Sequence, residues 1–238
     1  MRVLAMDSSG LVASVAIVED DTLIAEYTVN YKKTHSQTLL PMLDEVVKMI
    51  GQDLSEIDVI AVAAGPGSFT GLRIGSATAK GLGFALDKPL VSVPTLEGLA
   101  ANLYGIGDAV VCPMMDARRK QVYTGIYGYE GEEFQVILPQ TACPVEEIIE
   151  KCNELGRKVI LLGDGIPVYR EMIEKRMTVE HCYAPAHLNR QRAGAVARRA
   201  MDLIREGRTE TAADHVPVYL RKSQAERELE AKGRKLEE

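Results

Sequence analysis

The stretch Gly65-Pro66-Gly67-Ser68-Phe69-Thr70-Gly71 decides the fold, because it joins two segments with different patterns. The residues before it, 58–64, form a short apolar run of small and β-branched side chains, which is typical of a buried strand flanked by helices. The residues after it, 72–86, show helical periodicity that ends at Asp87-Lys88-Pro89. A buried strand, a glycine-rich turn and a helix together predict an α/β protein.

The chain upstream of this stretch has the pattern of strands followed by a helix. Three strand-like runs, 3–6, 12–18 and 23–29, are separated by turn-forming polar clusters and predict an antiparallel meander. Thr34 stands where a helix cap is expected, and Gly51 stands where a helix ends. Between them the apolar residues fall at helical spacing: Leu39, Leu40, Leu43, Val46, Val47 and Ile50.

The second part of the chain repeats this order of elements. Its first strand pattern ends in Met115-Asp116, as the first strand pattern of the chain ends in Met6-Asp7. We therefore predict two related α/β halves that face each other across a cleft, in preference to two unrelated small domains. The expected halves are 1–104 and 105–213, and we expect the extension 214–238 to be partly disordered or to pack back on the first half. The repeated patterns are strands 122–129 and 134–138, a helix 145–155, a strand 159–162, Gly163-Asp164-Gly165 and another helix.

Composition and charge exclude several classes of protein. The chain has 238 residues, of which 46% are hydrophobic and 26% are charged, and these proportions are typical of a folded globular protein. No apolar run reaches the ~20 residues of a transmembrane helix, and polar residues interrupt the N-terminus too early for a signal peptide, so we expect a cytoplasmic protein without a membrane contact. The cysteines form no C-x-x-C pair and are expected to be reduced core residues. The net charge of -6 argues against binding nucleic acid by charge alone.

The glycine-rich stretch is also a candidate for binding phosphate, because a glycine turn between a strand and a helix exposes backbone N–H groups. Gly65, Gly67 and Gly71 give the spacing G-x-G-x-x-x-G, which is one residue longer than the dinucleotide-binding pattern. No Walker A string occurs. A tight strand-to-helix turn without a ligand is the alternative interpretation.

The helix expected after this turn carries a stripe of very small residues. Gly71, Gly75, Ala79 and Gly83 recur every four positions and so share one face. Glycine inside a helix costs about 1 kcal/mol relative to alanine, so the stripe predicts close approach by another backbone. That backbone belongs either to the protein's own sheet or to a partner helix.

Two aspartates and one histidine are candidates for metal chemistry. Asp7 and Asp116 each end a first strand, where a nucleotide-hydrolysing protein of this plan would hold magnesium through water. Either aspartate can instead accept hydrogen bonds within its own turn, and for each one alone we favour that interpretation. A helical metal pair needs two ligands one turn apart, but four positions after His35 stands Leu39. We therefore predict no metal site and no catalytic residue.

Four strings of residues resemble the bacterial TsaB family, which is also called YeaZ: Asp7-Ser8-Ser9, the run from Gly65 to Gly75, Pro94-Thr95-Leu96-Glu97 and Asp116-Ala117-Arg118. The resemblance covers almost the whole chain. It implies a duplicated actin-like, Hsp70-like (ASKHA) fold and a non-catalytic role in making threonylcarbamoyladenosine in tRNA. The catalytic relative TsaD holds a metal with an H-x-x-x-H pair on its first helix. The resemblance therefore implies a paralogue that kept the scaffold and lost the chemistry.

The resemblance also implies partners and a surface that binds them. TsaB pairs with TsaD through the first helix and the helix after the glycine loop, the ATPase TsaE joins the assembly, and a homodimer is expected when the chain is alone. We expect only indirect contact with tRNA and no tightly bound cofactor. The partner interface is the place where ATP or ADP could bind. The residues expected at that interface are His35, Leu39, Leu43, Val46, Ile50, Leu72, Arg73, Gly75, Ala79, Lys80, Gly83 and Phe84. The residues expected in a vestigial nucleotide site are Asp7, Ser8, Ser9, Gly65, Gly67 and Asp116.

These observations lead to one expected function and two alternatives. We expect a scaffold subunit that pairs with and activates TsaD, and we expect Leu43→Glu to disrupt the pairing without unfolding the protein. The first alternative is a small-molecule phosphotransferase or ATPase that acts alone with Asp7, Asp116 and the glycine turns. The second is direct tRNA binding by the charged tail and the arginine-bearing helix expected at 188–204. The other interpretation of those arginines is a solvated basic face.

Overall fold

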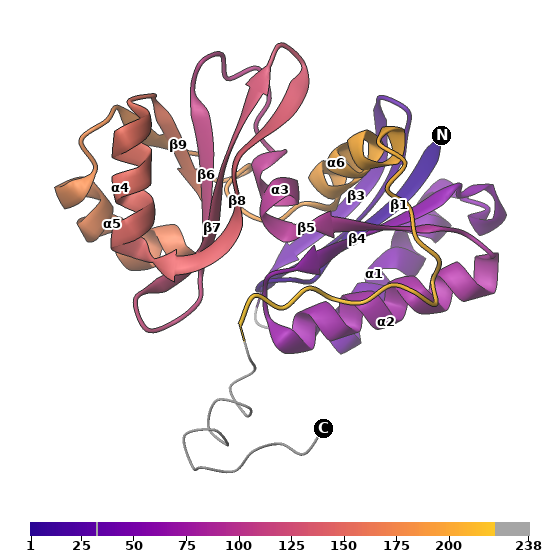
Figure 1. Ribbon diagram of the computed structural model, residues 1–238. Coiled ribbons are helices and arrows are strands. Elements are labelled where there is room, and N and C mark those ends of the chain that lie inside the picture. The colour runs from indigo at the N-terminus through magenta and orange to yellow at the C-terminus, as the bar shows by residue number, and fades with distance from the viewer. Residues whose placement is uncertain (32, 222–238) are drawn as a thin grey trace.

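The computed structural model of the protein describes residues 1–31 and 33–221 and consists of two α/β halves (Figure 1). The first half begins with an antiparallel meander and continues with alternating helices and parallel strands. Its elements are β1 (Arg2–Asp7), β2 (Val12–Glu19), β3 (Thr22–Asn30), α1 (His35–Ile50), the short 3-10 helix η1 (Leu54–Glu56), β4 (Val59–Gly65), α2 (Phe69–Leu86), β5 (Leu90–Pro94) and α3 (Thr95–Ala100).

The second half has the same order of elements, which confirms the predicted duplication. The five-stranded sheets run β3-β2-β1-β4-β5 and β10-β9-β6-β7-β8, so each sheet has its first strand at the centre. In each half the first strand pairs antiparallel with the second and parallel with the fourth. The elements are β6 (Val110–Asp116), β7 (Gln121–Glu130), β8 (Glu133–Pro144), α4 (Val145–Leu155), β9 (Val159–Leu162), α5 (Gly165–Arg176), β10 (His181–Tyr183) and α6 (Ala193–Arg205).

Helices cover both faces of the first sheet. α1 and α2 pack on one face, around a core that includes Leu4, Leu39 and Leu43. α6 packs on the other face, and α3 lies between the two sheets (Figure 1). Because helices cover both faces, β4 is buried along its whole length, as its apolar pattern predicts.

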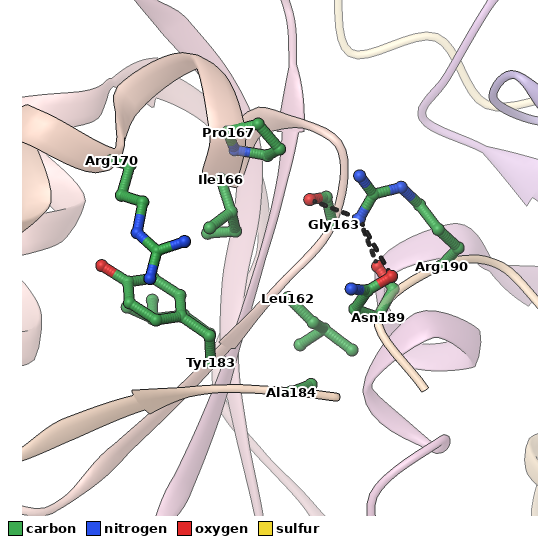
Figure 2. Close-up of a pocket in the computed structure, with 10 residues that line it drawn as sticks. Leu162, Gly163, Ile166, Pro167, Arg170, Tyr183, Ala184, Asn189 and Arg190 are labelled. Atoms are coloured by element: carbon green, nitrogen blue, oxygen red, sulfur yellow. Dashed lines mark hydrogen bonds between the residues drawn. The ribbon is translucent and has the colours of Figure 1, made fainter. Parts of the chain in front are cut away.

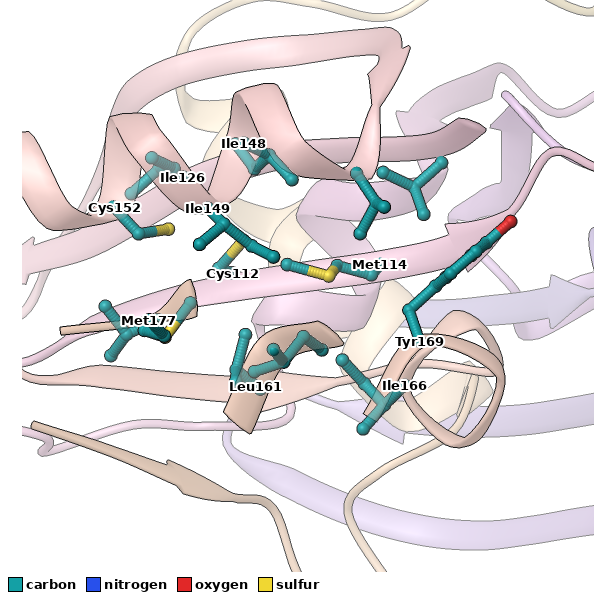
Figure 3. Close-up of a cluster of buried hydrophobic side chains, with 14 of the residues drawn as sticks. Cys112, Met114, Ile126, Ile148, Ile149, Cys152, Leu161, Ile166, Tyr169 and Met177 are labelled. Carbon is teal, nitrogen blue, oxygen red and sulfur yellow. The ribbon is translucent and has the colours of Figure 1, made fainter. Parts of the chain in front are cut away.

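The core of the second half lies between its sheet and the helices α4 and α5 (Figure 3). Cys112 and Cys152 are fully buried in it, and Cys143 lies at its edge. All the cysteines are free, but the prediction that they are core residues holds only for Cys112, Cys143 and Cys152, because Cys182 on β10 is partly exposed. Burial raises the pKa of the Cys143 thiol to about 11, so this thiol is a packing group and a poor nucleophile.

α6 lies inside the range 105–213 that we expected to form the second half, yet it packs on the first sheet. It begins at Ala193, later than the expected Leu188, because its first amides are satisfied by groups of the first sheet. The Ala193 N–H donates to Ser14 Oγ at 2.8 Å, and the Gly194 N–H donates to Glu26 Oε1 at 2.9 Å. A carboxylate at this end also favours the helix dipole.

The arginines of this helix do not all form a solvated face, which corrects one of our interpretations. Arg199 is buried, donates to Glu97 Oε2 at 2.8 Å and lies over the ring of Phe134. Arg192, just before the helix, pairs with Glu26. Both cations are therefore paired with carboxylates of other elements and hold those elements together, Arg199 inside the protein and Arg192 at its surface.

Residues 206–221 form an extended segment, which we call the strap, that runs back along the first half (Figure 1). Glu210 pairs with Leu90 of the edge strand β5, and the Val218 N–H donates to Ala64 O at 2.7 Å. Residues 214–219 of the expected extension thus pack on the first half, Arg221 donates to Ala117 O of the second half, and 222–238 lie outside the described residues. Within the described part of the chain, no helix combines the length and apolar character needed to cross a membrane.

Candidate functional site

The turn that follows β1 and the glycine-rich loop that follows β4 lie against each other. The Ser68 N–H donates to Ser9 O at 2.7 Å, and a Cβ on Gly67 would overlap the same carbonyl. Glycine is therefore needed at position 67 for close approach of two backbones, and a ligand is not needed to explain it.

Three of the amides in these two turns already have partners within the chain. The Gly65 N–H donates to Thr95 Oγ1 at 3.0 Å, the Gly71 N–H donates to Ser68 Oγ at 3.3 Å, and the Ser9 N–H donates to Asp7 Oδ1 at 2.8 Å. A phosphate cradle works by presenting unpaired N–H groups. The N–H groups of Ser9, Gly65 and Gly71 are therefore not free to bind a phosphate, and the vestigial nucleotide site that the sequence suggested stays a prediction.

Asp7 is held by its own turn and is almost completely buried. Its Oδ1 accepts bonds from both the N–H and the hydroxyl of Ser9, while its Oδ2 has no hydrogen-bond partner. Burial raises the pKa of this carboxyl to about 6, although the Ser9 bonds and the nearby His35 lower it. Asp7 therefore accepts hydrogen bonds within its own turn, as we favoured from the sequence. Its ionisation is costly, because Oδ2 is buried without a hydrogen-bond partner.

Asp116 holds the equivalent turn of the second half. It accepts from the Arg118 N–H at 2.9 Å and from the Tyr169 hydroxyl at 3.0 Å. The backbone N–H of Asp116 donates to Asp164, whose pKa is raised mainly by burial. Gln191 separates the two aspartate turns, since it lies against Gly10 and donates to Met115 Sδ at 3.6 Å.

The small-residue stripe of α2 faces the protein's own core. A Cβ on Gly71 would overlap the Ser8 carbonyl, and a Cβ on Gly75 would collide with Ser8 Oγ. Ala79 is fully buried, and Gly83 packs on Leu90 and Ala212. Of the two interpretations of this stripe, packing on the protein's own sheet is the one the structure shows.

Most of the residues expected at the partner interface are buried within the chain's own core, and their role at an interface stays a prediction. Seven of the expected interface residues are buried: Leu39, Leu43, Val46, Leu72, Gly75, Ala79 and Gly83. Arg73, Phe84 and Ile50 are exposed, and Lys80 and His35 are partly buried. Leu43 is only 3% exposed, so Leu43→Glu would put a charge in the core and unfold the protein instead of testing a contact.

The histidine that begins α1 has no second ligand. His35 Nε2 is 2.8 Å from Gly10 O, and its Nδ1 is buried without a partner. Leu39, at the position of a second metal ligand, is a core residue. Among residues 1–31 and 33–221, no group of three histidine, cysteine or acidic side chains could hold a metal ion.

The structure also brings together a set of polar residues that sequence spacing could not reveal. Ser76 Oγ is 2.8 Å from His215 Nε2, and His215 Nδ1 is 2.9 Å from Glu210 Oε1, an order of groups that resembles a hydrolytic triad. Ser76 is buried in the middle of α2 and cannot reach a substrate. The set fastens the strap to α2, as does Lys80, whose Nζ donates to the carbonyls of Ala213 and His215.

A cavity of about 320 Å³ lies in the second half, beside the end of β9 (Figure 2). Ile166 and Pro167 supply apolar lining, with Arg170 and Arg190 on opposite sides. Arg190 donates to Gly163 O at 3.1 Å and Asn189 O at 2.8 Å, and Arg170 lies 4.3 Å from the centroid of the Tyr183 ring. Both guanidinium groups therefore already interact with other groups of the chain, Arg190 with two carbonyls and Arg170 with an aromatic ring.

Two sheets of the same topology, with helices on their faces, define a duplicated actin-like fold. The profile of the family "TsaD: tRNA N6-adenosine threonylcarbamoyltransferase" matches residues 22–229. The TsaB protein of Bacillus subtilis is 37% identical over 95% of this chain and 96% of its own length. The TsaB protein of Escherichia coli is 29% identical over 98% of this chain and 100% of its own length. The solved structure of YeaZ from Pseudomonas aeruginosa superimposes with a TM-score of 0.79 at 30% identity, covering 92% of this chain and 99% of that one.

The chain therefore belongs to the family of the tRNA threonylcarbamoyladenosine biosynthesis protein TsaB.

Proposed function

We propose that this chain is a non-catalytic scaffold subunit in the biosynthesis of threonylcarbamoyladenosine in tRNA, and that it pairs with and activates a catalytic TsaD subunit. The observation that supports this proposal most is the replacement of a second metal ligand by Leu39, a side chain committed to the core. The pairing of the Ser9, Gly65 and Gly71 amides within the chain adds to it, because these three N–H groups are not available to a phosphate.

The pairing surface in this proposal is the outer side of α1 and α2. The inward apolar side chains of both helices belong to the core, but Leu40 is 55% exposed on α1 and Phe84 is 64% exposed on α2. Gly81, on the exposed side of α2, has open space where a Cβ would lie. A helix with such a bare outer side can be approached closely by helices of a partner. A homodimer through this surface would form when TsaD is absent, and TsaE, with ATP or ADP at the interface, would join the assembled pair.

Gel filtration and titration with purified TsaD test this surface. We expect Leu40→Glu or Phe84→Glu to weaken the pairing about tenfold or more, which corresponds to ~1.4 kcal/mol for each factor of ten. Met49→Glu is the matched control, because Met49 is also exposed on α1 but lines a hollow beside β3 together with Ala25 and Tyr27. Equal affinity for TsaD in all three variants and the wild type would contradict the assigned surface.

Reconstitution of tRNA modification tests the role itself. The chain alone is expected to leave tRNA unmodified, and it is expected to restore modification when TsaD and the other components are present. Transfer of the threonylcarbamoyl group by the isolated chain would overturn the scaffold assignment. Tight binding of ATP with magnesium by the isolated chain, measured by calorimetry, would favour the phosphotransferase or ATPase alternative.

A further inference from the structure

The turn between β6 and β7 presents three consecutive cationic residues in an unusual conformation. Arg118, Arg119 and Lys120 are all exposed, and their φ angles are 65°, 57° and 57°. Residues other than glycine rarely take positive φ, and a run of three is rarer still. Such strain persists only where the surroundings determine it, and it is found most often at functional sites.

The surroundings do fix this turn. The Ala117 N–H donates to Gln121 O at 3.0 Å, and the Val145 N–H at the start of α4 donates to Lys120 O at 3.2 Å. The strap adds a third tie, because Arg221 Nη1 donates to Ala117 O at 2.5 Å. The backbone of the turn is thus held from three sides, while its cationic side chains extend from it.

The strap also joins this turn to the start of α2. Tyr219, two residues before Arg221, stacks on Phe69 with 4.4 Å between the ring centroids and 3° between the planes. Arg73 Nε donates to the Tyr219 hydroxyl at 3.3 Å. Arg73, Arg221 and the turn therefore form one basic surface that extends from the first half to the second, and the ring of Tyr219 lies within it. We call it the basic surface.

The basic surface is poorly neutralised by the chain itself. Arg118 Nε lies 3.8 Å from Asp116 Oδ2. Glu146 is a second acidic group in this region, because its charge, like that of Arg118, influences the pKa of Tyr169. Among residues 1–31 and 33–221, the other four cations, Arg73, Arg119, Lys120 and Arg221, form no ion pair. Other basic groups of the protein, such as Arg192 and Arg199, are each paired with a carboxylate. Uncompensated cations gathered in one place on a chain of net charge -6 indicate an anionic partner.

We propose that the basic surface contacts the phosphate backbone of RNA. An exposed aromatic ring among flexible cations is typical of such contacts, whereas the centre of a protein interface is usually depleted of lysine. The proposal rests on the proposed function, in which tRNA is the substrate of the assembled complex. The net charge still argues against autonomous binding, so the surface adds phosphate contacts to those made by the catalytic subunit.

Titration of the TsaD complex with an unmodified tRNA transcript, followed by fluorescence anisotropy at about 50 and 200 mM salt, tests the proposal. We expect Arg119→Glu/Lys120→Glu to weaken binding about tenfold at the lower salt and to reduce the slope of log affinity against log salt by ~1 to 2. Lys175→Glu/Arg176→Glu, at the exposed end of α5, changes the same charge and should leave both values unchanged. Arg119→Lys/Lys120→Arg, which keeps the charge, should bind like the wild type.

Gel filtration of every variant with TsaD distinguishes failure of this inference from failure of the proposed function. Normal pairing with unchanged tRNA affinity and salt slope in Arg119→Glu/Lys120→Glu would overturn the RNA contact. Loss of pairing in that variant would also overturn it, because the surface would then bind protein. Should the wild-type chain not pair with TsaD, the proposed function fails, and the same titration of the isolated chain decides whether the basic surface binds RNA.

Discussion

Asp7 has a buried carboxyl whose ionisation opposes folding. Its pKa rises from the ordinary 3.8 to about 6, mainly through burial, so the protonated form is favoured in the folded state. The stability that depends on protonation is fully present below pH 3.8 and is lost as pH rises through 6. The cost of burying the ionised group is about 3 kcal/mol at pH 8 and roughly half of that at pH 5.

Asp7→Asn removes this pH-dependent cost and keeps the oxygen that accepts from Ser9. We expect Asp7→Asn to raise the free energy of unfolding, relative to the wild type, by about 1 to 1.5 kcal/mol more at pH 8 than at pH 5. Urea unfolding at the two pH values measures this difference. If the difference in unfolding free energy between the variant and the wild type were the same at both pH values, Asp7 would be ionised in the folded protein at both.

At the scale of elements, two glycines of α2 predict opposite effects of the same substitution. Gly71→Ala would drive a Cβ into the Ser8 carbonyl and push the start of α2 away from the β1–β2 turn. We expect it to cost roughly 2 to 4 kcal/mol of unfolding free energy. Gly81→Ala meets open space, and because alanine is the better helix former, it should stabilise the protein by up to about 1 kcal/mol. Urea unfolding of the two variants checks the signs, and destabilisation by Gly81→Ala would contradict the open position.

The same helices show what sequence patterns can and cannot predict. The periodicity of α1 predicted a helix and an apolar stripe, but a stripe does not tell whether it faces the chain's own sheet or a partner. Leu39 and Leu43 face inward, whereas Leu40, equally apolar, faces outward. The glycine spacing of α2 likewise indicated close approach without naming the approaching group, which is Ser8 at Gly71 and Gly75. The set of Ser76, Glu210 and His215 was unpredictable, because contact between α2 and the strap depends on long-range folding.

At the scale of the whole molecule, two helices join the halves. α3 follows a strand of the first sheet and contacts strands of both sheets, and α6 follows the second sheet but contacts β1 and β2. Leu96 and Leu99 of α3 share a cluster with Val111 and Tyr127 of the second half. The repeat predicted the two sheets, but it could not show where α3 and α6 pack, because the order of elements along the chain is the same for either arrangement. Neither half completes its core alone, so we expect calorimetry to record one unfolding transition, and two resolved transitions would contradict this.

Arg199 joins these parts and carries the last prediction. It lies on α6, pairs with Glu97 of α3 and covers the ring of Phe134 on β8. Arg199→Met should cost about 3 to 5 kcal/mol of unfolding free energy, because it leaves Glu97 buried without its cation. Adding Glu97→Leu should recover most of that loss, since two apolar side chains can replace a buried ion pair. A double-mutant cycle measured by urea unfolding tests the coupling. Equal stability of Arg199→Met and the double variant would mean that the stacking on Phe134, and not the charge of Glu97, accounts for the loss.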